Sequence, residues 1–296
     1  MNPVPAFAPE DNPYNIIYVD VTHRCQMSCA NCYLPNRQIP DLAFADYETF
    51  LRKLGSKTQI RLVGGEATLR SDLPELIALT KEIGHLPVLV TNGLKLSDRD
   101  YVQTLFKSGL RCLQLSMNGF DEDAIYQILD QQKCAKQKMQ ALENCLALKM
   151  KVSVSAILMK GLNEHLITKM MEYARRQPIY PKLNFRSRGN IGRFLSSYDT
   201  FRLDEMVNLI RSGLAPDETL HFFYAQGNQV RLRVQSPRWP KSLQMKLTDW
   251  QSYERTPDDL ETDFAWDPKR FSRGRMTQDF KVSPWFEHVV ENEFGY

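Results

Sequence analysis

The feature that most constrains the fold of this chain is a regular alternation of strand-like and helix-like segments over its first two thirds. Each short apolar run is followed by an amphipathic stretch, and this order predicts a parallel sheet whose strands are joined by right-handed helical crossovers. Six strands are expected, at residues 16–21, 59–63, 87–91, 111–117, 152–158 and 182–186. The predicted fold is α/β, a partial (β/α)6 barrel that is open on one side.

The strand sequences also predict which residues face the inside of this barrel. Side chains alternate between the two faces of a strand, so Cys112, Gln114 and Ser116 share one face and apolar residues share the other. We expect the polar face to point into the barrel and the apolar face to pack against helices. Ser155 in the fifth strand and Arg186 in the sixth lie on polar faces of the same kind.

Three of the six cysteines lie within eight residues, directly after the first strand. Cys25, Cys29 and Cys32 have the spacing C-x3-C-x2-C, and thiolates are the ligands that iron–sulfur clusters prefer. Three thiolates can hold three irons of a cubane cluster and leave the fourth iron open to bind and reduce another molecule. A structural metal site is instead normally closed by a fourth protein ligand.

The cysteine loop resembles the cluster-binding loop of the radical S-adenosylmethionine (SAM) superfamily, with the aromatic residue Tyr33 after the third cysteine. Three later motifs follow predicted strands in the order that this family needs: Gly64-Gly65-Glu66, Thr91-Asn92-Gly93 and Ser116-Met117-Asn118-Gly119. The resemblance covers roughly residues 14–195. It implies one [4Fe-4S] cluster on the three cysteines and SAM as the second cofactor. No cysteine follows Cys145, so an auxiliary cluster is not expected.

The resemblance also implies roles for the other motif residues. The two glycines and Glu66 would bind the methionine amino group of SAM, and Arg186 would pair with its carboxylate. Ser116 and Asn118 would contact the ribose hydroxyls or the carboxylate, and Tyr33 would pack beside the adenine or shield the cluster. The full set of cofactor-binding residues implied in this way is Tyr33, Gly64, Gly65, Glu66, Thr91, Asn92, Ser116, Asn118, Ser155 and Arg186. The motifs stand at the carboxyl ends of strands, where parallel α/β barrels bind ligands.

The two ends of the chain depart from the barrel pattern. Residues 1–15 form a Pro-rich extension, residues 16–200 the barrel core, and residues 201–296 a C-terminal segment. In that segment we expect a helix at 203–210 and a hairpin at 220–234, with its turn at 226–229. The tail that follows is rich in Trp, Pro and charge, and we expect it to cap the barrel opening.

The composition restricts the cellular setting. Lys and Arg number 38 against 35 Asp and Glu, and a net charge of +3 gives no general case for nucleic-acid binding. The N-terminus lacks the features of a secretory signal, and no apolar run approaches the ~20 residues that span a bilayer. Clustered cysteines fit a metal site in a reducing compartment, so we expect a cytoplasmic protein with no membrane partner.

These features together predict an enzyme that cleaves SAM reductively. The resulting 5′-deoxyadenosyl radical would abstract hydrogen from a peptide or small-molecule substrate, and a flavodoxin or ferredoxin would supply the electron. Two alternatives stay open. A radical enzyme that modifies RNA or a nucleotide would use Arg231 and Arg233 of the hairpin. A non-catalytic regulatory module would hold a cluster or zinc on the same cysteines, with a histidine such as His23 as a fourth zinc ligand.

Overall fold

Six parallel strands in chain order form the centre of the computed structural model, which describes residues 6–32, 34, 37–178, 181–188, 198–226, 229–249 and 273–284. They are β1 (Ile16–Thr22), β2 (Gln59–Gly64), β3 (Leu86–Thr91), β4 (Cys112–Ser116), β5 (Lys151–Leu158) and β6 (Lys182–Ser187). Each strand pairs in parallel with the next. The predicted partial barrel is confirmed, and each strand begins and ends within one residue of its predicted bounds.

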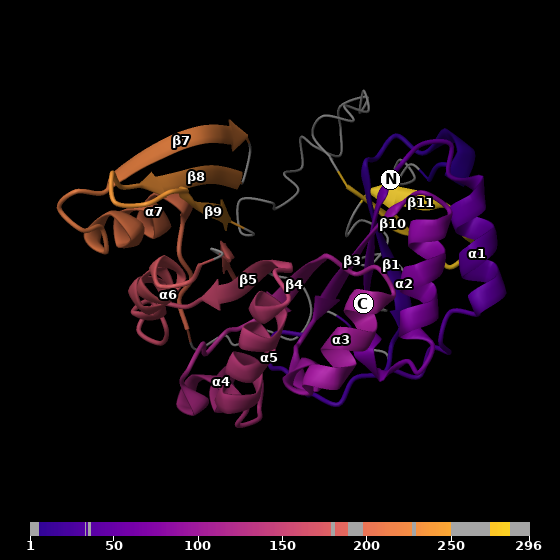
Figure 1. The fold of residues 1–296 in the computed structure, drawn as a ribbon, viewed down its shortest axis with the longest axis horizontal. Coiled ribbons are helices and arrows are strands. Elements are labelled where there is room, and N and C mark those ends of the chain that lie inside the picture. The colour runs from indigo at the N-terminus through magenta and orange to yellow at the C-terminus, as the bar shows by residue number, and fades with distance from the viewer. Residues whose placement is uncertain are drawn as a thin grey trace.

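The crossover helices lie on the outside of this curved sheet (Figure 1). They are α1 (Phe44–Lys53), α2 (Leu73–Glu82), α3 (Arg99–Lys107), α4 (Asp123–Leu129), α5 (Ala135–Ala147) and α6 (Leu166–Arg175). Three short 3-10 helices also occur: η1 (Pro9–Asp11), η2 (Ala67–Leu69) and η3 (Leu94–Ser97). Among the described helices, none has the length and apolarity that a bilayer crossing requires.

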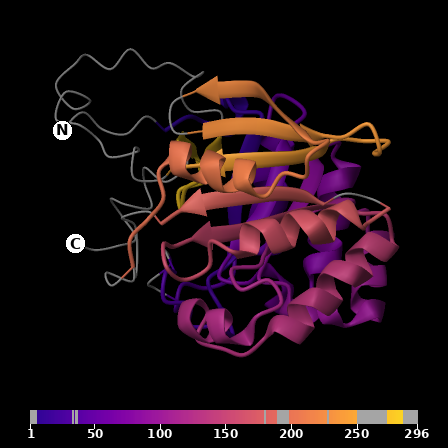
Figure 2. The same cartoon turned by 90° about the vertical axis from the view of Figure 1, so that its left-hand side faces the viewer.

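The C-terminal segment extends the sheet at both of its edges. α7 (Leu203–Ser212) precedes an antiparallel pair of β7 (Thr219–Gln226) and β8 (Gln229–Gln235), which confirms the predicted helix and the pairing of the hairpin strands. Residues 227 and 228 of the predicted turn lie outside the described residues. β9 (Leu243–Thr248) lies between β8 and β6, while β10 (Gly274–Met276) pairs with β1 and with β11 (Val282–Pro284). The strand order over the described residues is β11-β10-β1-β2-β3-β4-β5-β6-β9-β8-β7, and Figure 2 shows the C-terminal strands beside the barrel strands.

These edge strands give the C-terminal segment a role that the sequence patterns do not predict. β9 and β10 continue the wall of the barrel, so the segment is part of the sheet. The cap assigned to the tail falls largely on residues 250–272 and 285–296, which lie outside the described residues. That cap, and the division of the chain at residues 15 and 200, stay predictions.

The hydrophobic core fills the space between the sheet and the helices. Leu113 and Leu115 of β4 are buried in it, whereas Cys112, Gln114 and Ser116 line the barrel interior. The two faces of β4 are therefore arranged as the alternation predicts. This arrangement leaves polar side chains facing a space inside the barrel.

Candidate active site

The barrel interior contains a cavity of about 490 Å³. Inward side chains of β1 to β6 form its wall together with residues of β8 and β9. Gln59 lies at the amino end of its strand and Ser116 at the carboxyl end of its own, and both line the cavity. Asn31, which stands between Cys29 and Cys32, lines it as well. The cavity therefore extends through the barrel to the cysteine loop.

The cysteine loop follows the carboxyl end of β1 and is anchored by apolar packing. Met27 is buried in a small cluster with Leu94 and Tyr126, and Cys25 and Cys29 pack against that cluster. A buried apolar side chain between two of the cysteines fixes the loop to the barrel, because exposing it to water would be unfavourable. The loop is thus held in place by the protein itself.

Arg37 braces the same loop, although the sequence patterns do not assign it to the site. Its guanidinium donates hydrogen bonds to the carbonyl oxygen of Met27 at 2.6 Å and of Cys25 at 3.4 Å. It also donates to Sγ of Cys32 at 3.4 Å. Hydrogen bonds to ligand sulfurs are among the interactions that set the reduction potential of an iron–sulfur cluster. The sequence signal for this role is only a basic residue shortly after the third cysteine.

The three thiols fit a cluster ligand set. All three are half-buried and free of disulfides. Burial raises the pKa of the Cys25 and Cys29 thiols, and Cys25 and Cys32 both act electrostatically on Cys29, so the three sulfurs share one neighbourhood. Iron coordination would favour the thiolate form despite burial, because a bound metal deprotonates a coordinating thiol.

The zinc alternative gains no support from the structure. Among the described residues, no three His, Cys, Asp or Glu side chains are arranged to hold a single metal ion. A cubane cluster requires a different arrangement of ligands. Each thiolate ligates a separate iron, so the sulfurs surround a cluster and do not converge on one ion.

Gly64 and Gly65 are required by the backbone that enters the cysteine loop. The amide of Gly65 donates to the carbonyl of Thr22 at 2.8 Å, and the amide of Glu66 donates to the carbonyl of Arg24 at 2.8 Å. A Cβ on Gly65 would lie 2.4 Å from the carbonyl oxygen of Arg24, and one on Gly64 would lie 1.9 Å from that of Thr22. The glycines therefore place the Gly64-Gly65-Glu66 motif directly against the cysteine loop. Sequence reasoning anticipates close approach to a ligand and misses this contact within the chain.

Glu66 links its own motif to the Thr91-Asn92-Gly93 motif. Its buried carboxylate accepts hydrogen bonds from the Thr68 amide at 3.1 Å and the Thr68 hydroxyl at 2.7 Å. It also accepts from the Thr91 hydroxyl at 2.6 Å and from the Asn92 amide at 2.7 Å. The side-chain nitrogen of Asn92 lies 4.0 Å from Sγ of Cys25. These residues are thus brought together beside the cysteine loop, while contact of Glu66 with the ammonium of SAM stays a prediction.

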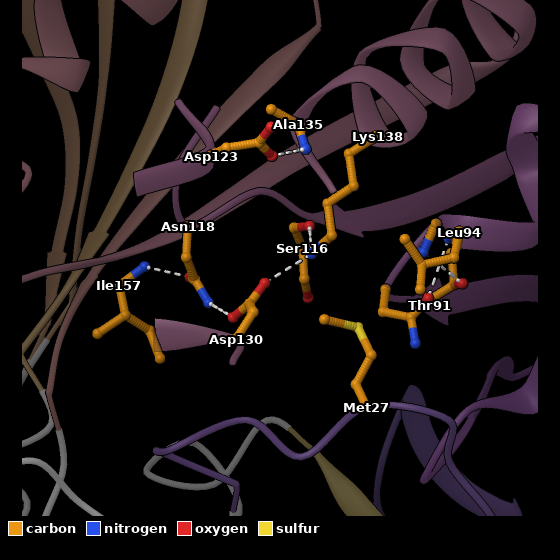
Figure 3. Close-up of polar contacts among 12 residues, drawn as sticks. Met27, Thr91, Leu94, Ser116, Asn118, Asp123, Asp130, Ala135, Lys138 and Ile157 are labelled. Atoms are coloured by element: carbon orange, nitrogen blue, oxygen red, sulfur yellow. Dashed lines mark hydrogen bonds and ion pairs between the residues drawn. The ribbon is translucent and has the colours of Figure 1, made fainter. Parts of the chain in front are cut away.

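Asn118 belongs to an internal network below the end of β4 (Figure 3). Its amide nitrogen donates to Asp130 at 2.8 Å, and its side-chain oxygen accepts from the Ile157 amide at 3.0 Å. Lys138 completes the network by donating to Asp130 at 2.7 Å and to the carbonyl of Ser116 at 3.1 Å. Both polar atoms of the Asn118 side chain are engaged, so its contact with ribose stays a prediction. Sequence patterns single out neither Asp130 nor Lys138, since lysine and aspartate side chains are usually solvated.

Replacing Lys138 by methionine is expected to lower the free energy of unfolding by roughly 3 kcal/mol, because it leaves the buried Asp130 carboxylate without its ion-pair partner. Urea unfolding followed by circular dichroism measures this change. Lys136→Met removes an exposed lysine from the same helix and serves as the matched control. Equal effects of the two substitutions would show that the buried pair does not hold the end of β4.

Ser155 and Arg186 lie together on β5 and β6. The Arg186 guanidinium donates to the Ser155 hydroxyl oxygen through Nε at 3.0 Å and Nη2 at 2.6 Å. Arg186 lines the cavity, and the buried Ser155 positions it. The pairing of Arg186 with the SAM carboxylate stays a prediction. Tyr33, the remaining predicted site residue, lies outside the described residues.

Lys246 of β9 is a cavity residue that the sequence patterns do not indicate. Burial, followed by the charges of Arg273, Arg186, Arg231 and Arg61, lowers the pKa of Lys246 to about 5. The amine is therefore neutral in the folded protein at neutral pH. In the unfolded chain it regains its ordinary pKa of 10.5 and is charged.

The pKa of Lys246 predicts a pH dependence of stability. Between the two pKa values the unfolded chain binds one more proton, so this residue makes stability rise with pH by up to about 1.4 kcal/mol per unit. Lys246→Met removes the effect. The Lys246→Met protein should therefore be more stable than the wild type near pH 6, and the difference in the free energy of unfolding should shrink towards about pH 9. Urea unfolding measures this difference. Parallel stability curves for the two proteins would contradict the assignment.

Comparison with known proteins agrees with this site. Residues 19–174 match the family described as the Radical SAM superfamily. The 7,8-dihydro-6-hydroxymethylpterin dimethyltransferase of Methanocaldococcus jannaschii is 30% identical over 185 residues, which cover 59% of this chain and 36% of that protein. The GTP 3′,8-cyclase of Staphylococcus carnosus is 28% identical over 216 residues, which cover 67% of this chain and 62% of the cyclase.

The fold is also similar to that of a protein of known structure. The crystal structure of Streptococcus suis SuiB superimposes with a TM-score of 0.62 at 14% identity, over 94% of this chain and 62% of SuiB. This chain thus spans less than two thirds of each of these proteins. The family match covers more than half of the chain and includes the cysteine loop and all three later motifs. The chain therefore belongs to the radical SAM superfamily, whose enzymes use a [4Fe-4S] cluster and SAM.

Proposed function

We propose that this enzyme abstracts hydrogen from a peptide or small molecule that binds in the barrel cavity. The observation that carries the proposal is that the cavity extends from the amino ends of the strands to the cysteine loop. Gln59 and Lys182 line it at the amino ends of their strands, and Asn31 lines it from the loop. A substrate inside the barrel would lie beside the cysteine loop. Small-molecule sites commonly measure about 300–1,000 Å³, and this cavity falls within that range.

The residues of the chain would hold and orient the two cofactors. When bound, the cluster and SAM supply the 5′-deoxyadenosyl radical that removes hydrogen from the substrate. The three loop thiolates would ligate three irons, with Arg37 donating to the sulfur of Cys32. The Gly64-Gly65-Glu66 backbone would meet the methionine amino group, and Arg186, positioned by Ser155, would meet the carboxylate. A cytoplasmic flavodoxin or ferredoxin would supply the electron.

The relatives leave the substrate open. Those named above act on a pterin and on GTP, and the chain spans only part of either protein. A nucleotide-modifying enzyme is the second candidate, favoured by the observation that Arg231 of the hairpin lines the cavity. A non-catalytic role is set aside because members of this family are enzymes.

Anaerobic reconstitution with iron and sulfide tests the proposed function. We expect a brown protein that releases 5′-deoxyadenosine and methionine from SAM when dithionite is added. Deuterium at the abstracted position of the true substrate should pass into 5′-deoxyadenosine. A colourless protein with one tightly bound zinc, or a brown protein that never cleaves SAM, would contradict the proposal.

A further inference from the structure

The cavity wall is strongly basic. Among the described residues that line it, eight are Lys or Arg and none is Asp or Glu. They come from strands on both sides of the barrel, with Arg61 on β2, Lys182 on β6, Arg231 on β8 and Lys246 on β9. This concentration of one sign of charge contrasts with the net charge of only +3 for the whole chain. A cavity lined by one sign of charge concentrates ligands of the opposite sign.

The basic side chains are close enough to act on one another across the barrel. Burial, followed by Arg231, Arg61 and Arg273, lowers the pKa of Lys182, and Lys246 responds to the same three arginines. In the part of the chain that the structure describes, neither lysine has a hydrogen bond or an ion pair. An anion in the cavity would relieve this repulsion and favour the protonated form of both amines.

Arg61 is held in an orientation toward the same space. Its Nη1 donates to the Tyr18 hydroxyl at 2.8 Å and to the Gln114 side-chain oxygen at 3.4 Å, and its guanidinium lies 5.2 Å from the centre of the Tyr18 ring. Its Nε is buried and has no hydrogen-bond partner among the residues that the structure describes. Tyr18 and Gln114 also line the cavity, so the guanidinium is fixed at the cavity wall and its Nε is available to donate to a ligand.

SAM does not account for this charge. The cofactor carries a sulfonium and an ammonium against one carboxylate, so it is itself a cation overall. One guanidinium such as Arg186 satisfies its carboxylate, and further cations would repel the sulfonium. The basic wall therefore points to the second molecule in the barrel.

We propose that the barrel cavity binds a phosphate-bearing small molecule, with its phosphate groups against Arg61, Lys182 and Lys246, and that this molecule is the substrate. The identification as substrate depends on the proposed function, whereas the binding site does not. Phosphate is favoured because guanidinium groups and protonatable amines converge on one small volume, and a phosphate chain carries several negative charges within such a volume. The cavity volume of about 490 Å³ favours a small molecule over a folded partner.

Isothermal titration calorimetry on the reconstituted holoenzyme, without SAM or reductant, tests the site. Inorganic tripolyphosphate is the first probe, with potassium chloride at matched ionic strength as the blank. We expect saturable binding of one tripolyphosphate per chain, weakened at least about tenfold by Lys246→Met and by Lys182→Met. Lys107→Met removes an exposed lysine from α3 and should leave the affinity unchanged.

Further titrations define the ligand and can overturn the proposal. GTP should bind at least as tightly as tripolyphosphate, and guanosine should not bind. A higher affinity for GTP would show that the nucleoside is also contacted, whereas equal affinities would assign the binding to the phosphates alone. Citrate that binds as tightly as tripolyphosphate, an acidic peptide that displaces it, or equal affinities of Lys107→Met and Lys246→Met would each overturn the proposal.

The two hypotheses fail in different ways. Tripolyphosphate binding by a protein that never cleaves SAM would refute the proposed function and keep the site. SAM cleavage by a protein that does not bind tripolyphosphate would refute only the phosphate site.

Discussion

Replacing Cys29 by alanine is expected to reduce 5′-deoxyadenosine formation to the background of a protein that has no cluster. The loop offers three thiols, and the remaining two would hold only two of the irons. The loop itself should keep its position, because Met27 anchors it through apolar contacts that do not involve a metal. Iron content, the absorbance of the reconstituted protein and 5′-deoxyadenosine measured by chromatography report the loss.

Cys145→Ala provides the matched control for this experiment. Cys145 is buried in the hydrophobic core on α5 and is not part of the loop. Its loss should cost about 1 kcal/mol of stability through a small cavity and leave cluster content and SAM cleavage intact. A Cys29→Ala protein that still binds four irons and cleaves SAM would remove Cys29 from the ligand set.

Replacing Gly64 by alanine is expected to lower the free energy of unfolding by about 5 kcal/mol or more and to abolish SAM cleavage. Gly64 has a φ of +122°, and its added Cβ would lie 1.9 Å from the carbonyl oxygen of Thr22. The strand end and the backbone entering the cysteine loop would have to move apart. Urea unfolding and 5′-deoxyadenosine release measure the two effects.

Gly84→Ala separates the collision from the backbone strain. Gly84 has a comparable φ of +103°, but an added Cβ there would meet no atom within 4 Å. Its cost should be limited to the strain of a non-glycine residue at positive φ, about 1–3 kcal/mol, with SAM cleavage retained. Equal losses of stability and of SAM cleavage in the two variants would mean that the Gly64-Gly65-Glu66 motif is not packed against the cysteine loop.

Local patterns predict most of the barrel because its signals are local. The alternation on β4 separates Leu113 and Leu115 from Cys112, Gln114 and Ser116, and the structure buries the first group and turns the second inward. The cysteine spacing and the glycine pair are equally local. A short window of sequence therefore carries both the fold class and the position of the cofactor site.

The missed features all depend on contacts between distant parts of the chain. β10 pairs with β1, and Arg275 forms a buried ion pair with Asp20 across 255 positions. No local pattern fixes such a pairing. The Lys138–Asp130 pair is buried because Lys138 of α5 also reaches the carbonyl of Ser116 at the end of β4, although lysine and aspartate are usually solvated. The basic wall likewise appears only when β2, β6, β8 and β9 are placed around one cavity.

The central claim is that three protein thiolates leave one iron of the cluster open to SAM. Mössbauer spectroscopy of ⁵⁷Fe-reconstituted protein under anaerobic conditions tests it most directly. The account predicts a [4Fe-4S] cluster with one iron distinct from the other three, whose signal changes when SAM is added. A cluster with four equivalent, protein-ligated irons that ignores SAM, or no cubane at all, would contradict it.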